Sequence, residues 1–308
     1  MNRAVVSTKR AYSRDRESTP LVASAAAGDF AKTLALRGRQ AGKKEIQKFR
    51  EEVLGYWKKH GRHSLPWRKT KDPYRILVSE IMLQQTQVPR VIDKYKEFLR
   101  VFPTVRALAR AKLSDVLKMW SGLGYNRRGK YLHDAAKVIV TEHRGNIKNA
   151  TMHTLPGVGP YTRAAVRAFA FNEPHTMVET NIRAAYIHHF FQAKKRVDDA
   201  QLSVLIEKGA HGQDPRNWHS ALMDYGAHIK KLHDNPTRKS KHYVMQSKFE
   251  GSLRQVRGAV LKVLNAGSHG DLAISQKLSF DEKMVRDALA GLARDGLVTS
   301  EKGSWRIA

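Results

Sequence analysis

Residues 154–166 read TLPGVGPYTRAAV, a glycine-containing turn that runs directly into a helix-forming segment. Gly157 and Gly159 allow the backbone to turn tightly and to approach another surface closely. Backbone N–H groups of such a turn, at a helix N-terminus, form a site for one phosphate group. An ordinary turn between two helices is the alternative interpretation. The strongly basic composition of the chain favours a clamp on a DNA phosphate.

Charge is the dominant feature of the composition. Lysine and arginine number 56 against 28 acidic residues, which gives a formal net charge of +28, and the excess is spread along the whole chain. Such an excess predicts a polyanionic partner, of which nucleic acid is the commonest; a solvated basic surface is the alternative. The 308 residues, 41% of them hydrophobic, suffice for about two domains with sizeable cores.

The chain contains no cysteine. Disulfides, thiolate zinc sites and cysteine-ligated iron–sulfur clusters are therefore excluded. No run of 18 apolar residues exists that could span a membrane. We expect an intracellular protein of the cytoplasm or nucleoid, with no metal site, no cofactor and no membrane partner.

The chain divides into four segments by composition. Residues 1–43 are rich in Ser, Ala and Arg and are predicted to form a disordered basic tail. Residues 44–234 place apolar side chains at helical spacing almost throughout, with short Gly, Pro and Asn-containing loops and no convincing strand. Residues 235–248 are polar, basic and Pro-containing, and are predicted to be a linker. Residues 249–308 form a second domain.

That C-terminal segment shows three helical patterns followed by a hairpin. Ser279 and Glu282 predict a capping box at the start of the third helix, and the hairpin is expected to turn at Lys302 and Gly303. Three helices followed by a two-stranded ribbon resemble a winged helix, a relative of the helix-turn-helix. A small packing domain without DNA contact is the alternative.

The motifs along residues 44–234 resemble those of the helix-hairpin-helix DNA glycosylases, and among them the MutY adenine glycosylases. The resembling segments are LPWR (65–68), DPYRILVSEIMLQQTQV (72–88), FPTVRALARA (102–111), LKMWSGLGYNRRGKYLH (117–133), LPGVGPYT (155–162), VETNIRA (178–184) and ALMDYGA (221–227). The resemblance implies a mostly α, two-lobed helix-hairpin-helix glycosylase fold, followed here by the winged-helix-like domain.

A glycosylase needs one group to protonate the departing base and a carboxylate to stabilise an oxocarbenium-like sugar. Glu80, in the apolar run LVSEIML, matches the family's base-protonating acid; a core glutamate paired with Arg68 is the alternative. Glu179 stands where the family has an aspartate, and is predicted to be the stabilising carboxylate, oriented by Asn181; a simple helix cap is the alternative. Tyr161 replaces the Schiff-base lysine of bifunctional relatives and is expected to hydrogen-bond Glu179.

Further site residues follow from the same resemblance. Trp67, Arg68 and Asp224 match positions that line the adenine pocket, where a ring stacks on the base and charged groups read its edge. Core packing is the alternative for the tryptophan. The positions expected to contact DNA are the gap-filling Gln84 and Gln85, the aromatic wedge Tyr125, for which core packing is again the alternative, and the hairpin residues Leu155, Gly157, Val158, Gly159 and Thr162.

Three departures from the family affect the prediction. No cysteines follow ALMDYGA to hold an iron–sulfur cluster, the 8-oxoguanine-recognition domain is replaced, and Glu179 is one methylene longer than aspartate. We expect a monomeric, monofunctional glycosylase without lyase activity that acts on double-stranded DNA containing a mismatched or damaged base. Adenine in an A/G or A/8-oxoguanine mismatch is the expected target. A uracil or thymine mismatch glycosylase, or a non-catalytic DNA-binding protein on this scaffold, are the alternatives.

Overall fold

The computed structural model describes residues 41–308, so that the predicted disordered tail lies almost entirely outside the described residues. Within the described part, helices dominate and no helix is long and apolar enough to cross a membrane. The predicted helical organisation of residues 44–234 is confirmed: the elements there form two lobes with separate hydrophobic cores.

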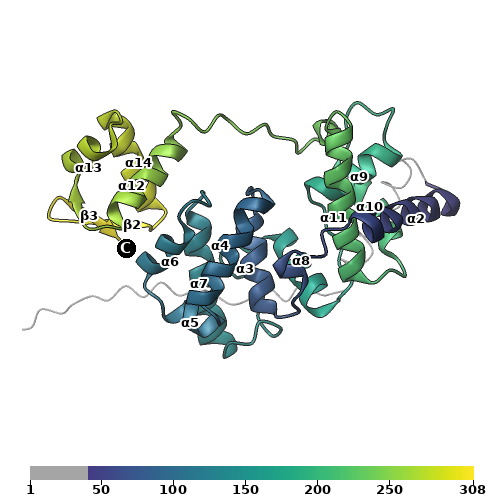
Figure 1. Ribbon diagram of the computed structural model, residues 1–308, viewed down its shortest axis with the longest axis horizontal. Helices are drawn as coiled ribbons and strands as arrows, with labels where there is room; N and C mark the ends of the chain where they lie inside the picture. The colour runs from purple at the N-terminus through teal and green to yellow at the C-terminus, as the bar shows by residue number, and fades with distance from the viewer. Residues whose placement is uncertain (1–40) are drawn as a thin grey trace, which may run out of the picture. The chain divides into compact units, whose positions relative to one another are not determined.

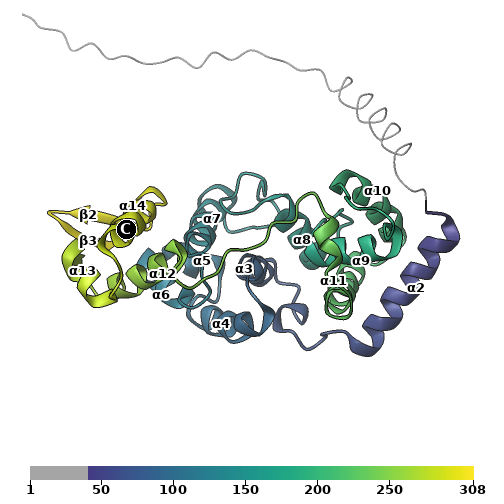
Figure 2. The ribbon, with the colours of Figure 1, turned by 90° about the horizontal axis from the view of Figure 1, so that it is seen from above.

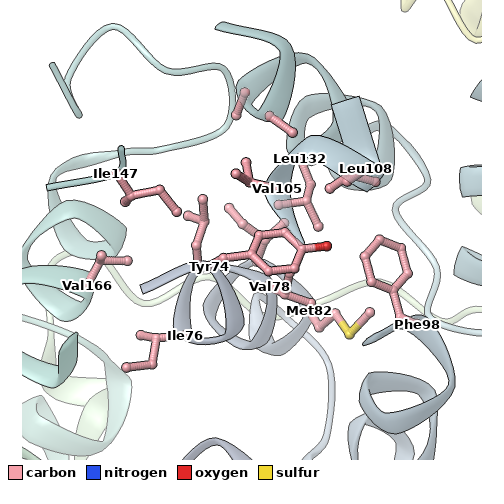
Figure 3. Close-up of a cluster of buried hydrophobic side chains, with 14 of the residues drawn as sticks. Tyr74, Ile76, Val78, Met82, Phe98, Val105, Leu108, Leu132, Ile147 and Val166 are labelled. Atoms are coloured by element: carbon pink, nitrogen blue, oxygen red, sulfur yellow. The ribbon is translucent and has the colours of Figure 1, made fainter. Parts of the chain in front are cut away.

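The first lobe is built around helix α3. Asp72 caps this helix by accepting a hydrogen bond from the backbone N–H of Tyr74 at 2.8 Å. Tyr74, Val78 and Met82, spaced four residues apart, point from α3 into a core that also contains Phe98 (Figure 3). The elements of this lobe are η1 (Pro66–Arg68), α3 (Pro73–Leu83), α4 (Val88–Val101), α5 (Val105–Arg110), α6 (Leu113–Trp120) and α7 (Arg127–His143) (Figure 1).

The second lobe consists of α2 (Lys43–His60), α9 (Thr180–Phe190), α10 (Asp199–Ala210) and α11 (Pro215–Leu232). Helix α8 (Pro160–Phe171) belongs to both lobes, since Val166 is buried in the first core while Ala165 and Ala168 are buried in the second. Helices α9 and α11 lie side by side in both views (Figures 1 and 2). At their contact a Cβ on Gly226 would lie 1.9 Å from the carbonyl oxygen of Asn181, so only glycine fits.

Part of the predicted linker is structured. Residues Pro236–Lys239 form the short helix η2, and Ser240 makes a parallel bridge to Val197. The Val197 N–H donates to the Lys239 carbonyl at 2.8 Å, and the Lys241 N–H donates to the Val197 carbonyl at 2.9 Å. Within the expected linker, residues 243–248 and Asn235, the N-cap of η2, lack a regular element or turn.

The C-terminal segment contains three helices and a small antiparallel sheet with strand order β1-β3-β2. Its core includes Leu117 of α6. The hairpin between β2 and β3 turns at Lys302 and Gly303, as predicted, and both have positive φ (49° and 75°), as a two-residue type I′ turn requires. The elements are α12 (Leu253–Leu264), β1 (His269–Gly270), α13 (Asp271–Leu278), α14 (Glu282–Arg294), β2 (Val298–Glu301) and β3 (Ser304–Ile307).

The capping box predicted for α14 is wrong. Asp281 is the N-cap, and its carboxylate accepts hydrogen bonds from the backbone N–H groups of Lys283 (2.9 Å) and Met284 (3.2 Å). Ser279 instead ends α13 in a left-handed conformation with φ 53°. Aspartate competes at least as well as serine for an N-cap, and this aspartate stands directly before the helix.

The hairpin at residues 155–159 uses its two glycines differently. Gly157 has φ 72°, and a Cβ there would lie 2.8 Å from the Cβ of Tyr131. Gly159 has φ −76°, acts as the N-cap of α8, and has open space where a Cβ would be. The conformation therefore requires glycine at position 157 only.

We predict that Gly157→Ala lowers the free energy of unfolding by at least about 1 kcal/mol, because alanine must adopt a left-handed conformation against Tyr131. Gly159→Ala is the matched control and should change the free energy by less than about 0.5 kcal/mol. Urea denaturation of both variants measures the difference. Equal stabilities would show that the hairpin relaxes around the added methyl group.

Candidate active site

A cavity of about 820 Å³ opens between the two lobes, within the size range of small-ligand sites. It is lined by residues of α3, α8, α11 and the first turn of α9, together with the segment before α3. The predicted site residues that line it are Trp67, Arg68, Glu80, Gln84, Gln85, Tyr161, Glu179 and Asn181. Segments far apart in the sequence are thus brought to one site.

Glu80 lies in the third turn of α3 and is 5% exposed. Its Oε2 accepts a hydrogen bond from the Tyr161 hydroxyl at 3.1 Å. Burial raises the pKa of Glu80 to about 7, with the hydrogen bond from Tyr161 opposing and the negative charge of Glu179 adding to the rise. Arg68, the partner in the alternative interpretation, forms its ion pair with Asp224. Glu80 is therefore a carboxyl group that holds a proton near neutral pH.

Glu179 is the N-cap of α9. Its Oε1 accepts hydrogen bonds from the backbone N–H groups of Asn181 (2.7 Å) and Ile182 (2.8 Å), and the Asn181 amide donates to Oε2 at 3.2 Å. Burial raises the pKa of Glu179, although both backbone hydrogen bonds oppose the rise. Glutamate is not a preferred N-cap, and this one also lines the cavity. The carboxylate of Glu179 therefore both caps α9 and lines the cavity.

Tyr161 lies in the first turn of α8 and donates to Glu80 rather than to Glu179, which corrects the expected pairing. Burial and the charges of both glutamates raise the pKa of Tyr161 well above its usual value. Its hydroxyl therefore keeps its proton and serves as a hydrogen-bond donor to the carboxyl group of Glu80.

Arg68 and Asp224, two of the residues predicted to line the base pocket, form a hydrogen-bonded group with Arg62 at the edge of the cavity. Asp224 is 3% exposed, and its Oδ1 accepts from Arg68 Nη2 at 2.9 Å while its Oδ2 accepts from the Arg62 N–H at 2.8 Å. The side chain of Arg62 also pairs with Asp224. Burial would raise the pKa of Asp224, but the two arginines outweigh it and hold that pKa below its usual range. Asp224 does not line the cavity itself, and thus holds the arginines that do.

Trp67 takes part both in the hydrophobic core of the first lobe and in the cavity wall. Its ring packs edge-on against Tyr95, with centroids 5.6 Å apart, and belongs to the first core. The same side chain lines the cavity. It can therefore offer a rigid apolar wall to a ligand.

Gln85 and Tyr125 share a strained backbone conformation, with φ 54° and 47° respectively. Such conformations in non-glycine residues cluster at functional sites. The amide of Gln84 donates to the Thr162 hydroxyl at 3.2 Å. Tyr125 does not line the cavity; its hydroxyl accepts a hydrogen bond from Arg254 at 2.7 Å.

The hairpin residues lie apart from the cavity. Leu155 and Val158 are 3% and 6% exposed and belong to the first core, so their side chains are not available to DNA. Thr162 is also buried. If the hairpin contacts DNA, the contact must therefore be made by its backbone, for example around Gly159, where an added Cβ would meet no atom within 4 Å.

Three charged residues of the cavity lining, Arg62, Arg216 and Lys230, were missed by the sequence-based prediction. Arg62 precedes the LPWR motif, and no spacing distinguishes it from the neighbouring basic residues. For Lys230, in contrast, helical spacing in the sequence could have predicted its position in the site. It lies seven residues after Met223 and three after Ala227 on α11, and all three line the cavity, as helical periodicity requires.

An iron–sulfur cluster does not fit this chain. The segment after ALMDYGA offers no thiolate, and among the described residues no group of three His, Asp or Glu side chains could hold a metal ion. His233 of this segment stacks on His188, with ring centroids 4.4 Å apart. The segment is joined to the second lobe by Lys239, which donates to the Gln192 carbonyl at 2.8 Å, and by the Lys241–Asp198 ion pair at 2.7 Å.

Comparison with known proteins identifies the family. Residues 78–208 match the HhH-GPD superfamily base excision DNA repair proteins. The adenine DNA glycosylase of Mycobacterium tuberculosis is 33% identical over 276 residues, which cover 79% of this chain and 88% of that protein. The chain belongs to the adenine DNA glycosylase family of the HhH-GPD superfamily. The adenine DNA glycosylase of Buchnera aphidicola subsp. Baizongia pistaciae is 34% identical over 194 residues, covering 61% of this chain and 54% of that relative.

Solved structures confirm the predicted mostly helical glycosylase fold. A thermostable thymine-DNA glycosylase is similar with a TM-score of 0.54 and 29% identity, over 61% of this chain and 88% of that one. Endonuclease III trapped as a covalent DNA intermediate matches with a TM-score of 0.50 and 15% identity, over 68% of this chain and 92% of that one. This second likeness concerns the fold alone.

We predict that Tyr161→Phe raises the pKa of Glu80, which is about 7 in the unaltered protein, because the hydroxyl donates to the charged form of that carboxyl group. Titration of ¹³C-labelled glutamate side chains by NMR measures the midpoint. Tyr243→Phe, at a partly exposed tyrosine outside the cavity, is the control. An unchanged Glu80 midpoint in Tyr161→Phe would show that the hydroxyl does not favour the ionised form.

Proposed function

We propose that this protein is a DNA N-glycosylase of base excision repair that hydrolytically removes adenine mispaired with guanine or 8-oxoguanine. The observation that carries the proposal is a cavity of about 820 Å³, with room for a flipped nucleotide, that is lined by two carboxyl groups in unlike surroundings. Glu80 is desolvated and bonded to one hydroxyl, whereas Glu179 accepts two N–H groups at a helix start. Because their environments differ, one carboxyl group can act as a proton donor while the other stays ionised.

In the proposed reaction a flipped base enters the cavity and the protonated carboxyl group of Glu80 donates its proton to the departing base. The ionised Glu179 stabilises the positive charge that develops on the sugar while the glycosidic bond breaks. Water then completes hydrolysis, because Tyr161 has no amine to attack the sugar. The rate should fall as pH rises through about 7 and Glu80 loses its proton. It should also fall at low pH, when Glu179 becomes protonated.

Adenine is proposed as the base because relatives over most of this chain are adenine DNA glycosylases. Thymine or uracil opposite guanine is the second candidate, supported by the 29% identity to a thymine-DNA glycosylase. Trp67 and Arg68, which line the cavity, are proposed to stack on the base and read its edge. Retention of Glu80, Tyr125 and the predicted adenine-pocket positions argues against a purely DNA-binding role.

We also propose that residues 44–234 act as the glycosylase domain and residues 249–308 as a winged-helix-like DNA-binding domain. The described C-terminal domain has exposed cations of two kinds. Arg286 and Arg306 are paired with Glu282 (3.2 Å) and Glu301 (3.0 Å). Exposed cations that make no ion pair with a described residue include Lys283, Arg294 and Lys302. These are the better candidates for phosphate contacts.

Further DNA contacts are proposed for Gln84 and Gln85 at the cavity, and for Tyr125 and the backbone of the 155–159 hairpin outside it. The strained conformations of Gln85 and Tyr125 support this assignment. The proposed partner is double-stranded DNA with a mismatched or damaged base, bound by a monomer in the cytoplasm or nucleoid. No cofactor has a role in the proposed reaction.

We predict that Glu80→Gln slows base excision by about 10²–10⁴-fold and Glu179→Gln by at least about 10²-fold, with nearly unchanged DNA affinity. Glu179→Asp should retain measurable activity, because aspartate keeps both the charge and the cap. Single-turnover gel assays on duplexes with A:8-oxoguanine, A:G, U:G, T:G and hypoxanthine measure excision and identify the base.

The same gels test the absence of lyase activity, since the strand should break only after treatment with hot alkali. Glu173→Gln, on the loop before α9 and not in the cavity lining, is the matched control for loss of one carboxylate. If Glu179→Gln excises the base at the rate of the unaltered protein, Glu179 acts as a helix cap only and has no catalytic role. No excision from any duplex by the unaltered protein would contradict the enzyme assignment.

For the C-terminal domain we predict that Lys283→Gln combined with Lys302→Gln reduces the slope of log affinity against log salt concentration by about 1–2, because each phosphate contact contributes about 0.9. Fluorescence anisotropy over a salt series measures the slope. Arg286→Gln, on the same helix but paired with Glu282, should change it less. A slope unchanged in the double variant would assign the domain another role.

A further inference from the structure

Helix α11 presents a stripe of side chains to the cavity. Ser220, Met223, Ala227 and Lys230 all line it and recur every three to four residues. Lys230 stands in the last turn of the helix and is partly buried, whereas the adjacent Lys231 is exposed and does not line the cavity. The helix therefore directs one specific lysine into the site that contains Glu179.

Lys230 differs from the other cations around the cavity. Arg62 and Arg68 both form ion pairs with Asp224. Arg216 donates to the carbonyl oxygens at the end of α8, with 2.7 Å to that of Phe169. Lys230 makes no ion pair or side-chain hydrogen bond with any described residue, although it is partly buried. A cation withdrawn from water without a direct partner needs a nearby negative charge.

We propose that Lys230 is a positioning residue for the catalytic reaction, which holds the carboxylate of Glu179 ionised and directed into the cavity. This inference rests on the proposed glycosylase function, because it assigns a task to Lys230 only if Glu179 acts as an anion. Lys230 acts through Glu179 rather than on the base.

The charges around Glu179 show why this lysine is needed. Glu80 of α3 and Tyr161 of α8 face it with a second carboxyl group and a hydroxyl, and neither supplies positive charge. Arg183 of its own helix also lowers the pKa of Glu179, but it binds Asp199 through two nitrogens, at 2.8 and 2.6 Å, and this ion pair offsets part of its charge.

Lys230 of α11 is a cation without a paired anion among the described residues, and the positive charge of Arg62 also acts on it. The influence is mutual. Burial raises the pKa of Glu179 and the charge of Lys230 lowers it, while burial lowers the pKa of Lys230 and the charge of Glu179 raises it. Each group therefore favours the charged form of the other without a direct ion pair.

The test compares Lys230→Gln, Lys230→Arg and the control Lys231→Gln, which removes the same charge from the next residue. In Lys230→Gln the titration midpoint of Glu179, measured by ¹³C NMR, should rise by about one unit. The acidic limb of the excision-rate profile should move to higher pH by the same amount, so that the rate below the midpoint falls about tenfold. Lys230→Arg should restore both, and Lys231→Gln should leave both unchanged.

The two readouts separate the failure of this inference from the failure of the proposed function. A Glu179 midpoint unchanged in Lys230→Gln overturns the role of Lys230, whatever the activity. A midpoint that shifts in a protein that excises no base supports the charge coupling and contradicts the glycosylase assignment. A rate that falls equally at every pH, with a constant midpoint, assigns Lys230 to another step and also overturns the inference.

Discussion

The site depends on the close approach of α11 to the first turn of α9. At their contact Gly226 has no room for a Cβ, which would lie 1.9 Å from the carbonyl oxygen of Asn181. Asn181 in turn bonds the carboxylate of Glu179 through its backbone and its side chain. Any larger residue at position 226 would push the start of α9 away. Helix α11 also carries Asp224 and Lys230. The contact at Gly226 therefore brings both residues close to Glu179 at the start of α9.

Two carboxyl groups in one cavity create an electrostatic problem that the surrounding residues resolve. Both glutamates are desolvated, and the negative charge of Glu179 further raises the pKa of Glu80. Among the described residues Glu80 accepts a hydrogen bond from one hydroxyl only, whereas Glu179 receives two backbone N–H groups, the Asn181 amide and the positive fields of Lys230 and Arg183. Proton sharing is thereby biased toward Glu80. An acid and an anion can coexist near neutral pH only because these donors are distributed unequally.

Sequence patterns sufficed for the helices and the hairpin, because apolar periodicity and turn residues are local signals. The cavity residues came from family motifs, and most of them do meet in the structure. What local patterns could not supply were the pairings across the lobes: Tyr161 with Glu80, and Arg62 with Asp224. Both join residues at least 80 positions apart, where geometry rather than sequence spacing selects the partner. The capping error at Ser279 had a local cause, since an aspartate two residues later competed for the same helix end.

The extra methylene of Glu179 has a structural consequence of its own. An aspartate N-cap commonly folds its carboxylate back onto the N–H groups of its first turn. Glu179 does this as well, through Oε1, and its extended backbone (φ −128°, ψ 173°) accommodates the longer side chain. Its Oε2 accepts only the Asn181 amide among the described residues. One oxygen is thus fixed by the helix start, while the other has a single donor and retains acceptor capacity on the cavity side. The hydrogen bonds of the N-cap thus hold in place the Glu179 carboxylate that we propose stabilises the sugar cation.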